Sequence, residues 1–141
     1  LYTDMQRMGY ALKNGESTPP KSVIKVFNTL VDAIEEGIEN CKPGVLAYKI
    51  DDIVRGKILS SGYINYNHAT GHPVGLAVHD IGAVISTRSS KRARLPLIEN
   101  GIYTLEPRIN IPNGGSIEEM ILVTKYGGKP LTAPQKDIYL V

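Results

Sequence analysis

Apolar residues recur at three- and four-residue intervals between positions 23 and 41, which is the period of a helix with one buried face. The members of this stripe are Val23, Phe27, Leu30, Ile34, Ile38 and Cys41. Thr18-Pro19-Pro20 offers a cap and a first-turn proline before it, and Lys42-Pro43-Gly44 ends it. A second apolar stripe runs from Leu46 to Ile58 and stops at Gly62. The pattern therefore predicts two amphipathic helices joined by a short break.

The other apolar segments are short and bounded by glycine, proline and asparagine, which is typical of strands. We expect strands at Leu1–Leu12, Gly75–Val84, Gly101–Ile111, Ser116–Thr124 and Asp137–Val141. Pro112-Asn113-Gly114-Gly115 indicates a tight connection, and Tyr126-Gly127-Gly128 another turn. Helices first and strands later favour an α+β fold, with the helices on one face of a largely antiparallel sheet.

Composition fits one ordinary globular domain. The chain has 141 residues, of which 42 % are apolar and 21 % charged, and no apolar run approaches the ~18–20 residues of a membrane span. The net charge of +2 is too small to imply a nucleic-acid or membrane partner. The basic segment Arg88–Arg94 has no interleaved aromatic residue, which favours a solvated surface loop over a nucleic-acid patch. The lone Cys41 excludes an intrachain disulfide, fits a small buried residue and indicates a reducing, cytoplasmic compartment.

All three histidines lie in one short segment, at positions 68, 72 and 79. The spacing of His68 and His72 invites a zincin site, in which two imidazoles on one helix face bind one zinc ion. The intervening residues forbid it, because position 69 lacks the glutamate base, Gly71 weakens a helix and Pro73 moves His72 out of the α region. A helical zinc motif is therefore excluded.

An extended chain still brings these histidines together. Positions 68 and 72 share a face of an extended segment, because side chains alternate with period two. His79 has the opposite parity and joins them only through a bulge or bend, which we expect near Gly75. Since imidazole is a common metal ligand and proton carrier, the clustering favours a functional site over three structural histidines.

Carboxylates interrupt several of the expected strands. These are Asp4, Glu106, Glu118 and Glu119, and for each the alternative is a solvent-facing strand position. Because Glu118 and Glu119 are adjacent, they point to opposite faces, so at most one can face a site. A core-facing carboxylate must be paired, protonated or bound to metal. One Asp, one His and two Glu suit Mn²⁺, Fe²⁺, Co²⁺ or Zn²⁺ in a two-metal hydrolase.

Four separated motifs occur in the order of the pita-bread metallopeptidases, the family of creatinase, aminopeptidase P, prolidase and methionine aminopeptidase. They are Thr3–Met8, His68–Gly75 with His79-Asp80, Thr104–Pro107, and Ile117–Glu119 with Leu122–Thr124. The chain resembles, from its first residue to its last, the C-terminal part of the catalytic domain of a Xaa-Pro peptidase of prolidase or aminopeptidase P type. The resemblance implies a curved, mostly antiparallel sheet with helices on its outer face, and an upstream half before Leu1.

The resemblance also implies a site with two divalent metal ions bridged by a water or hydroxide and held by two Asp, one His and two Glu. The residues that match the metal ligands are Asp4, His72, Glu106 and Glu118. The remaining ligand, a first aspartate, is expected upstream of Leu1. The metal ions implied are manganese or cobalt, with zinc or iron as alternatives.

The resemblance assigns three further roles. Glu106 matches the glutamate that moves a proton from the water to the departing proline nitrogen, His79 the histidine that stabilises the tetrahedral intermediate, and His68 another substrate-side histidine. Two positions depart from the family pattern. Ser116 stands where many relatives have an arginine, and the segment at 79–82 is His-Asp-Ile-Gly where His-Glu-x-Pro is commoner. The subfamily and the length of the substrate therefore stay open.

Metal-dependent hydrolysis of Xaa-Pro bonds is the function that the resemblance implies, with a proline-containing peptide as substrate and a homodimer as the expected assembly. A pita-bread peptide- or protein-binding module that has lost catalysis is the alternative, and the intact ligand set argues against it. A third reading keeps the fold and the metals but changes the substrate class. The isolated 141-residue segment is expected to be inactive, because the first aspartate and the upstream half are missing from it.

Overall fold

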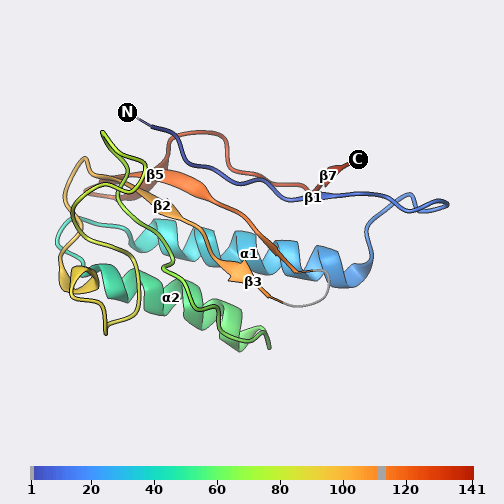
Figure 1. Ribbon diagram of the computed structural model, residues 1–141, viewed down its shortest axis with the longest axis horizontal. Helices are drawn as coiled ribbons and strands as arrows, with labels where there is room; N and C mark the ends of the chain where they lie inside the picture. The colour runs from blue at the N-terminus through green and yellow to red at the C-terminus, as the bar shows by residue number, and fades with distance from the viewer. Residues whose placement is uncertain (1, 111–113) are drawn as a thin grey trace.

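Two helices lie side by side along one face of a set of short strands (Figure 1). The computed structural model describes residues 2–110 and 114–141. Helix α1 spans Lys21–Asn40 and helix α2 spans Ala47–Ser60, so both expected helices are confirmed. No helix in these residues is long and apolar enough to cross a membrane.

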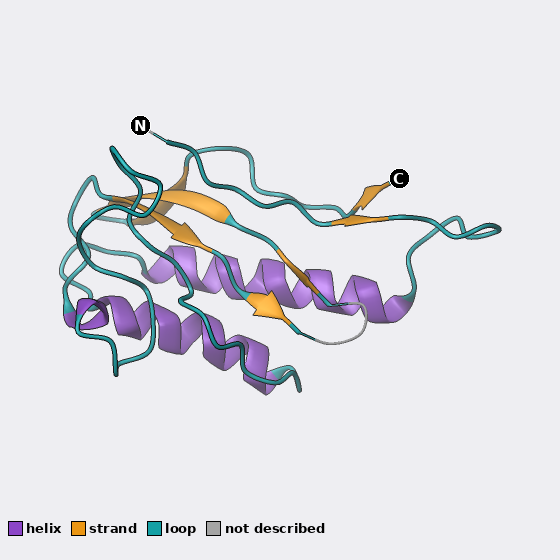
Figure 2. Cartoon of the chain, in the orientation of Figure 1, coloured by secondary structure: helices purple, strands orange, loops and turns teal. Residues whose placement is uncertain are grey.

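The strands form one small sheet and two isolated pairs (Figure 2). In the sheet, β5 lies between β2 and β6 and is antiparallel to both. Strand β3 pairs antiparallel with β4, whereas β1 pairs parallel with β7. The bounds are β1 Gly9–Tyr10, β2 Ile102–Leu105, β3 Arg108–Ile109, β4 Gly115–Ser116, β5 Glu119–Thr124, β6 Gly127–Pro130 and β7 Tyr139–Leu140. The α+β class with a largely antiparallel sheet is confirmed.

Most expected strands exist in shortened form. The segment 101–111 divides into β2 and β3 around Pro107, which has no N–H to donate to a ladder. Residues 2–12 contribute only β1 and an isolated bridge at Gln6. The turn expected at 126–128 lies at 125–126, and β6 begins at Gly127. Of the connection expected at 112–115, Pro112 and Asn113 lie outside the described residues, as does Ile111.

The strand expected at Gly75–Val84 is wrong, because this segment is a series of bends. The carboxylate of Asp80 accepts hydrogen bonds from the backbone N–H groups of Leu76 (2.8 Å) and Ile81 (2.7 Å). Such local side-chain bonds compete with a strand ladder for the same backbone donors. Leu76 and Ile81 are 90 % and 89 % exposed. Their apolar side chains predicted a half-buried strand here, but neither side chain is buried.

The core lies between the strands and the two helices. The strands contribute odd-numbered residues to it, including Leu105, Ile109, Ile117, Ile121 and Val123. Helix α1 crosses α2 closely at Gly37, where a Cβ atom would lie 2.7 Å from Cγ2 of Val54. Cys41 at the end of α1 is fully buried and makes no disulfide. The even-numbered strand positions are left to face away from the helices, and the candidate site lies there.

The basic segment forms a surface loop around the 3-10 helix η1, Arg92–Arg94. Arg92 is exposed, yet its guanidinium donates to the backbone carbonyls of Asp80 (2.6 Å) and Gly82 (2.8 Å). This arginine therefore ties the loop to the bend that carries His79.

Candidate metal centre

Four neighbouring chain segments carry the candidate site. Glu118 pairs antiparallel with Gln6 of the N-terminal segment, β5 pairs with β2, and β2 pairs through Tyr103 with Pro73. Directly opposed residues of antiparallel chains share a face. Asp4, His72, Glu106 and Glu118 therefore converge on the face opposite the helices, although up to 114 positions separate them in the sequence.

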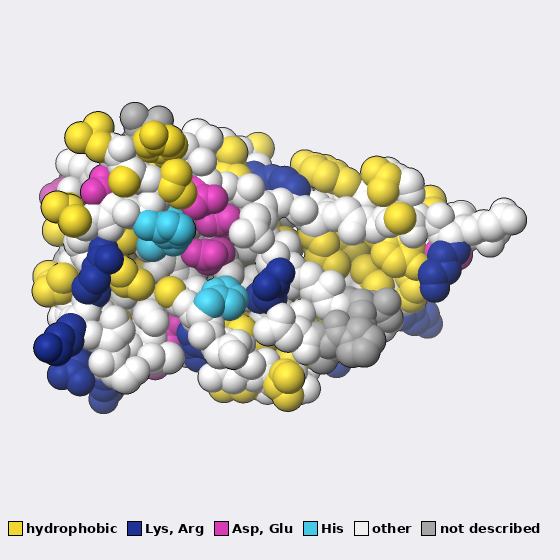
Figure 3. Space-filling model, in the orientation of Figure 1, with side chains coloured by type: hydrophobic (Ala, Val, Ile, Leu, Met, Phe, Trp, Pro, Cys, Tyr) yellow, Lys and Arg dark blue, Asp and Glu magenta, His cyan; other side chains and the backbone are white. Residues whose placement is uncertain are grey.

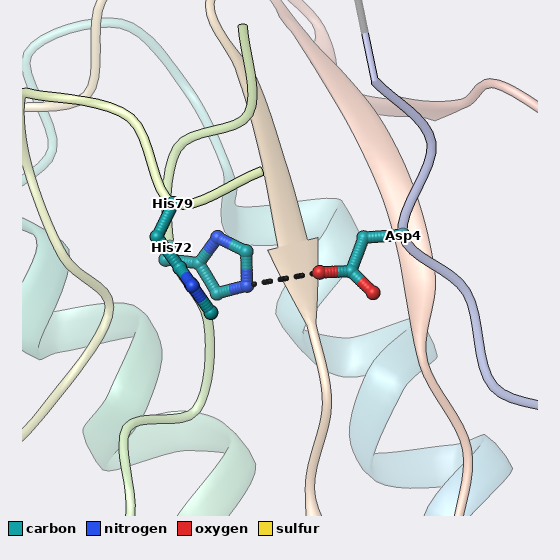
Figure 4. A group of neighbouring side chains, drawn as sticks. All are labelled: Asp4, His72 and His79. Carbon is teal, nitrogen blue, oxygen red and sulfur yellow. Dashed lines mark ion pairs between the residues drawn. The ribbon is translucent and has the colours of Figure 1, made fainter. Parts of the chain in front are cut away.

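His72 lies at the centre of this group. Its Nε2 atom is 3.4 Å from Oδ2 of Asp4 and 3.4 Å from Oε1 of Glu106. Figure 4 shows the imidazole directed toward the Asp4 carboxylate, with His79 beside it. Donor atoms lie within 4.8 Å of one another in two groups, Asp4 with His72 and His79, and His72 with Glu106 and Glu118. The structure thus brings together all four residues predicted as metal ligands.

Crowding of acidic groups shifts the pKa values. Burial, with the negative charges of Glu106 and Asp4, raises the pKa of Glu118 to about 8. Burial and the charge of Asp4 raise the pKa of Glu106 above its usual range. Burial lowers the pKa of His72, and the neighbouring His79 adds to this effect. Without a cation, the two carboxyl groups are therefore held toward their protonated forms and His72 toward its neutral form. A cation bound nearby would favour the ionised carboxylates and the neutral imidazole.

The residues fit divalent metal ions. Glu118 is buried and its Oε2 atom has no hydrogen-bond partner among the described residues. An unsatisfied buried carboxylate oxygen is costly and calls for a ligand or ion. Three carboxylates and one imidazole form the oxygen-rich donor set that suits Mn²⁺, Fe²⁺, Co²⁺ or Zn²⁺. Figure 3 shows acidic side chains and histidines gathered on this open face.

Backbone contacts fix the position of His72. Its N–H donates to Oγ1 of Thr104 (3.0 Å) and its carbonyl accepts from the N–H of Thr104 (2.9 Å). The preceding Gly71 has no room for a side chain, because a Cβ atom would lie 1.9 Å from the carbonyl oxygen of Thr104. Nδ1 of His72 lies 3.2 Å from the carbonyl oxygen of Pro73. When Nδ1 donates there, Nε2 keeps its lone pair for the site.

The other two histidines line the entrance. The bend after Gly75 brings the ring of His79 to a centroid distance of 4.0 Å from His72, at an interplanar angle of 60°, so the bend expected there is confirmed. His68 is exposed and packs against Tyr66 at a centroid distance of 4.8 Å. All three histidines and Glu106 line one pocket of about 380 Å³.

A buried ion pair on α2 was not predicted from the sequence. Arg55 donates from Nε and Nη2 to the two carboxylate oxygens of Asp51, at 2.9 and 2.8 Å. The same guanidinium donates to the carbonyl of His68 (3.0 Å), and Thr70 donates its hydroxyl to Asp51. The pair therefore ties α2 to the histidine segment. An Asp and an Arg four residues apart within the apolar stripe of a helix are the signal that could have revealed it.

The comparisons with known proteins agree with this geometry. A family model described as metallopeptidase family M24 matches residues 1–125. The chain belongs to this family. It is 36 % identical over 124 residues to a Xaa-Pro dipeptidase of Pyrococcus horikoshii, a match that covers 86 % of this M24 chain and 34 % of that protein.

Solved structures show the same fold. A prolidase from Thermococcus sibiricus superposes with a TM-score of 0.83 at 26 % identity, over 99 % of this chain and 36 % of that one. An X-Pro aminopeptidase from Thermotoga maritima gives a TM-score of 0.82 at 30 % identity, over 99 % and 38 %. The M24 chain therefore has the pita-bread fold, and it spans about a third of the length of the curated relatives that it matches.

Proposed function

We propose that the protein carrying this M24 chain hydrolyses Xaa-Pro peptide bonds with the help of two divalent metal ions. Manganese and cobalt are the ions that we expect it to use. The observation that carries this proposal is the convergence of Asp4, His72, Glu106 and Glu118, with an unpartnered buried oxygen on Glu118. The similarity to a protein named as a Xaa-Pro dipeptidase supports a proline-containing peptide as the substrate.

The metal ions would be held by these four side chains, and when bound they supply an activated water and polarise the scissile carbonyl. The chain's own acid–base group is Glu106. Burial and the charge of Asp4 raise its pKa, which suits a carboxyl that must hold a proton as well as release it. Glu106 takes a proton from the attacking water and passes it to the departing proline nitrogen.

The histidines at the entrance act on the substrate. His79 lies against His72, where its N–H can donate to the oxygen on which negative charge develops. His68 shares the pocket with both and contacts the peptide from the open side.

We infer further that these 141 residues form the C-terminal portion of a catalytic domain whose first aspartate ligand precedes Leu1. The isolated segment is then inactive, and measurable turnover from it would contradict this inference. A homodimer is the assembly that we propose, and the fully buried, unpaired Cys41 supports a cytoplasmic location.

The test uses the full-length protein, stripped of metal with a chelator and then supplied with Mn²⁺, Co²⁺, Zn²⁺ or Fe²⁺ in turn. We expect cleavage of an Ala-Pro dipeptide only after metal is added, and little cleavage of Ala-Ala. Metal analysis should find about two ions per protein, as a two-metal site requires. No bound metal and no cleavage with any of these ions would overturn the proposal and favour a peptide-binding module.

A further inference from the structure

Arg55 on α2 uses every hydrogen-bond donor of its guanidinium. Its Nε and Nη2 atoms donate to the two carboxylate oxygens of Asp51, at 2.9 and 2.8 Å. Nη2 also donates to the carbonyl of His68 (3.0 Å). Nη1 donates to the carbonyl of Tyr66 and to the side-chain oxygen of Asn65 (2.7 Å). A guanidinium has five N–H groups, so these five contacts leave none free. Only two of them serve the ion pair, and the other three bind the histidine segment.

The contacts from Arg55 stand where most of the chain has backbone hydrogen bonds. Among the described residues, no backbone group of positions 64–69 bonds with another backbone group. Such bonds resume at Thr70, whose carbonyl accepts from the N–H of Glu106 (2.7 Å), and at Gly71. A backbone carbonyl without a backbone partner needs another donor, and here a side chain of α2 supplies it. The path of positions 64–69 is therefore set by Arg55 and not by a strand ladder.

The ring of His68 depends on the same arginine. Cζ of Arg55 lies 4.0 Å from the centroid of the Tyr66 ring, which is a cation–π contact. Tyr66 is buried, and its ring packs against the ring of His68 at a centroid distance of 4.8 Å. Arg55 thus holds the backbone of His68 directly and its imidazole through Tyr66.

His68 needs this support because its side chain is exposed at the entrance of the candidate site. It lines the pocket of about 380 Å³ together with Glu106 and the other two histidines. An exposed imidazole on a segment without backbone pairing has several positions open to it unless another group selects one. Catalysis is sensitive to such freedom, since a displacement of about 1 Å can cost about 100-fold in rate.

We propose that Arg55 is a positioning residue, which fixes the imidazole of His68 relative to Glu106 at the entrance of the site. The inference rests on the function proposed above for what His68 does to a peptide. Arg55→Lys separates position from charge. It keeps a cation beside Asp51, but an ammonium carries three donors on one nitrogen and cannot reproduce the planar set of five contacts.

The kinetic test uses Arg55→Lys in the metal-loaded full-length protein, with Ala-Pro as the substrate. We expect kcat/KM to fall about ten- to hundredfold. The affinity for Mn²⁺ should stay within about twofold of wild type, because Thr104 and Gly71 hold His72 independently of α2. Arg94→Lys makes the same exchange at an exposed arginine outside the pocket and should keep the wild-type kcat/KM. An unchanged kcat/KM in Arg55→Lys overturns the proposal.

A double-mutant cycle with His68→Ala distinguishes positioning from a general loosening of the fold. If Arg55 acts through His68, Arg55→Lys should lower kcat/KM by no more than about twofold in the His68→Ala background. An arginine that only stabilises the fold costs the same factor in both backgrounds, and that result contradicts the proposal.

Nuclear magnetic resonance follows His68 without turnover. In the full-length protein loaded with Zn²⁺, which is diamagnetic, the wild type should show a nuclear Overhauser effect between the rings of Tyr66 and His68. Arg55→Lys should lose this effect, while the ring signals of His72 stay in place. Asn65→Ala removes one exposed acceptor, leaves the ion pair intact and should weaken the same effect. An effect of wild-type strength in both variants overturns the proposal.

The positioning and the hydrolysis fail in different ways. If the wild type cleaves no Xaa-Pro dipeptide but Arg55→Lys loses the ring contact of His68, the hydrolysis is wrong and the positioning stands. If the wild type cleaves Ala-Pro and Arg55→Lys changes neither kcat/KM nor the ring contact, the positioning is wrong and the hydrolysis stands.

Discussion

Glu118 and Glu119 are consecutive residues whose carboxylates lie on opposite sides of the sheet. Glu118 faces His72 and Glu106, with one oxygen unpartnered among the described residues. Glu119 is equally buried, yet it accepts hydrogen bonds from Arg7 (3.1 Å) and from the backbone N–H of Gln135 (3.0 Å). The expectation that these adjacent residues point to opposite faces is thus met, and the two carboxylates should respond in opposite ways to the same substitution.

Glu118→Gln should stabilise the metal-free protein at alkaline pH. The pKa of Glu118 is about 8 in the folded protein and near 4.5 in a solvated chain, so the folded state keeps a proton that the unfolded state releases between these values. Stability of the wild type therefore falls as pH rises through this window. Glutamine does not titrate, so the variant should be the more stable protein at pH 8, and the difference should shrink toward pH 5. Urea unfolding in the presence of a chelator measures it.

Two other acids serve as controls. Glu99→Gln alters an exposed carboxylate and should leave the pH dependence as it is. Glu119→Gln breaks the charged contact with Arg7 and should destabilise the protein by about 1–3 kcal/mol. Equal behaviour of the Glu118 and Glu119 variants at pH 8 would contradict the assignment of the two faces.

His72→Ala should remove both metal binding and turnover in the full-length protein. His72 is the residue common to both groups of clustered donor atoms. Losing a partner that merely orients a ligand costs about 10–100-fold in affinity, so loss of a ligand itself should cost more than about 100-fold. Calorimetric titration with Mn²⁺ measures the affinity. His68→Ala is the matched control, since it should keep the metal and impair only turnover; normal Mn²⁺ affinity in His72→Ala would refute the ligand assignment.

Gly71→Ala should destabilise the protein by more than about 2 kcal/mol, because the new methyl group has to displace the segment from the β2 edge. The added carbon would overlap the carbonyl of Thr104, which neighbours His72 in the same pairing. Metal affinity should therefore fall together with stability. Gly56→Ala makes the same chemical change in α2, where nothing lies within 4 Å, and should stabilise by about 0.5–1 kcal/mol. Thermal unfolding of the two variants gives the comparison.

Arg55→Ala should cost about 3–5 kcal/mol, because it leaves the buried carboxylate of Asp51 without its cation. It also removes the donor to the carbonyl of His68. Lys57→Ala, on the same helix, breaks contacts with the half-exposed acids Asp32 and Glu36 and should cost no more than about 1 kcal/mol. If urea unfolding shows similar losses of unfolding free energy for the two variants, the buried Asp51–Arg55 pair stabilises the protein no more than the exposed contacts of Lys57.

The apolar period predicted the helices, and the motifs named four residues that the structure brings together at the candidate metal centre. The stripe from Val23 to Cys41 is long enough to determine α1, and the motifs around His72 and Glu106 name their chemistry without any distance. The strands were harder. Two-residue strands such as β3 and β4 carry too little pattern to locate, and the turn at Gly75–Val84 depends on a contact from Asp80 that hydropathy cannot express.

Contacts between distant segments were beyond the sequence. The hydrogen bond from Arg55 to the carbonyl of His68 joins α2 to the histidine segment, and no pattern in the sequence pairs these two residues. The register that places Arg108 opposite Ser116 depends on how the two-residue strands β3 and β4 align. Both features depend on which residues face one another across the fold, and a single sequence does not record that.

The alternation of faces from Ile117 into β5 has a consequence for how this protein can change. Ile117, Ile121 and Val123 belong to the hydrophobic core, whereas Glu118 lies on the other face, at the candidate metal centre. A single residue inserted or deleted just ahead of Ile117 would reverse the two faces, turning Glu118 toward the helices and Ile117 away from them. The register of this segment is therefore as necessary to the candidate site as the carboxylate of Glu118 itself.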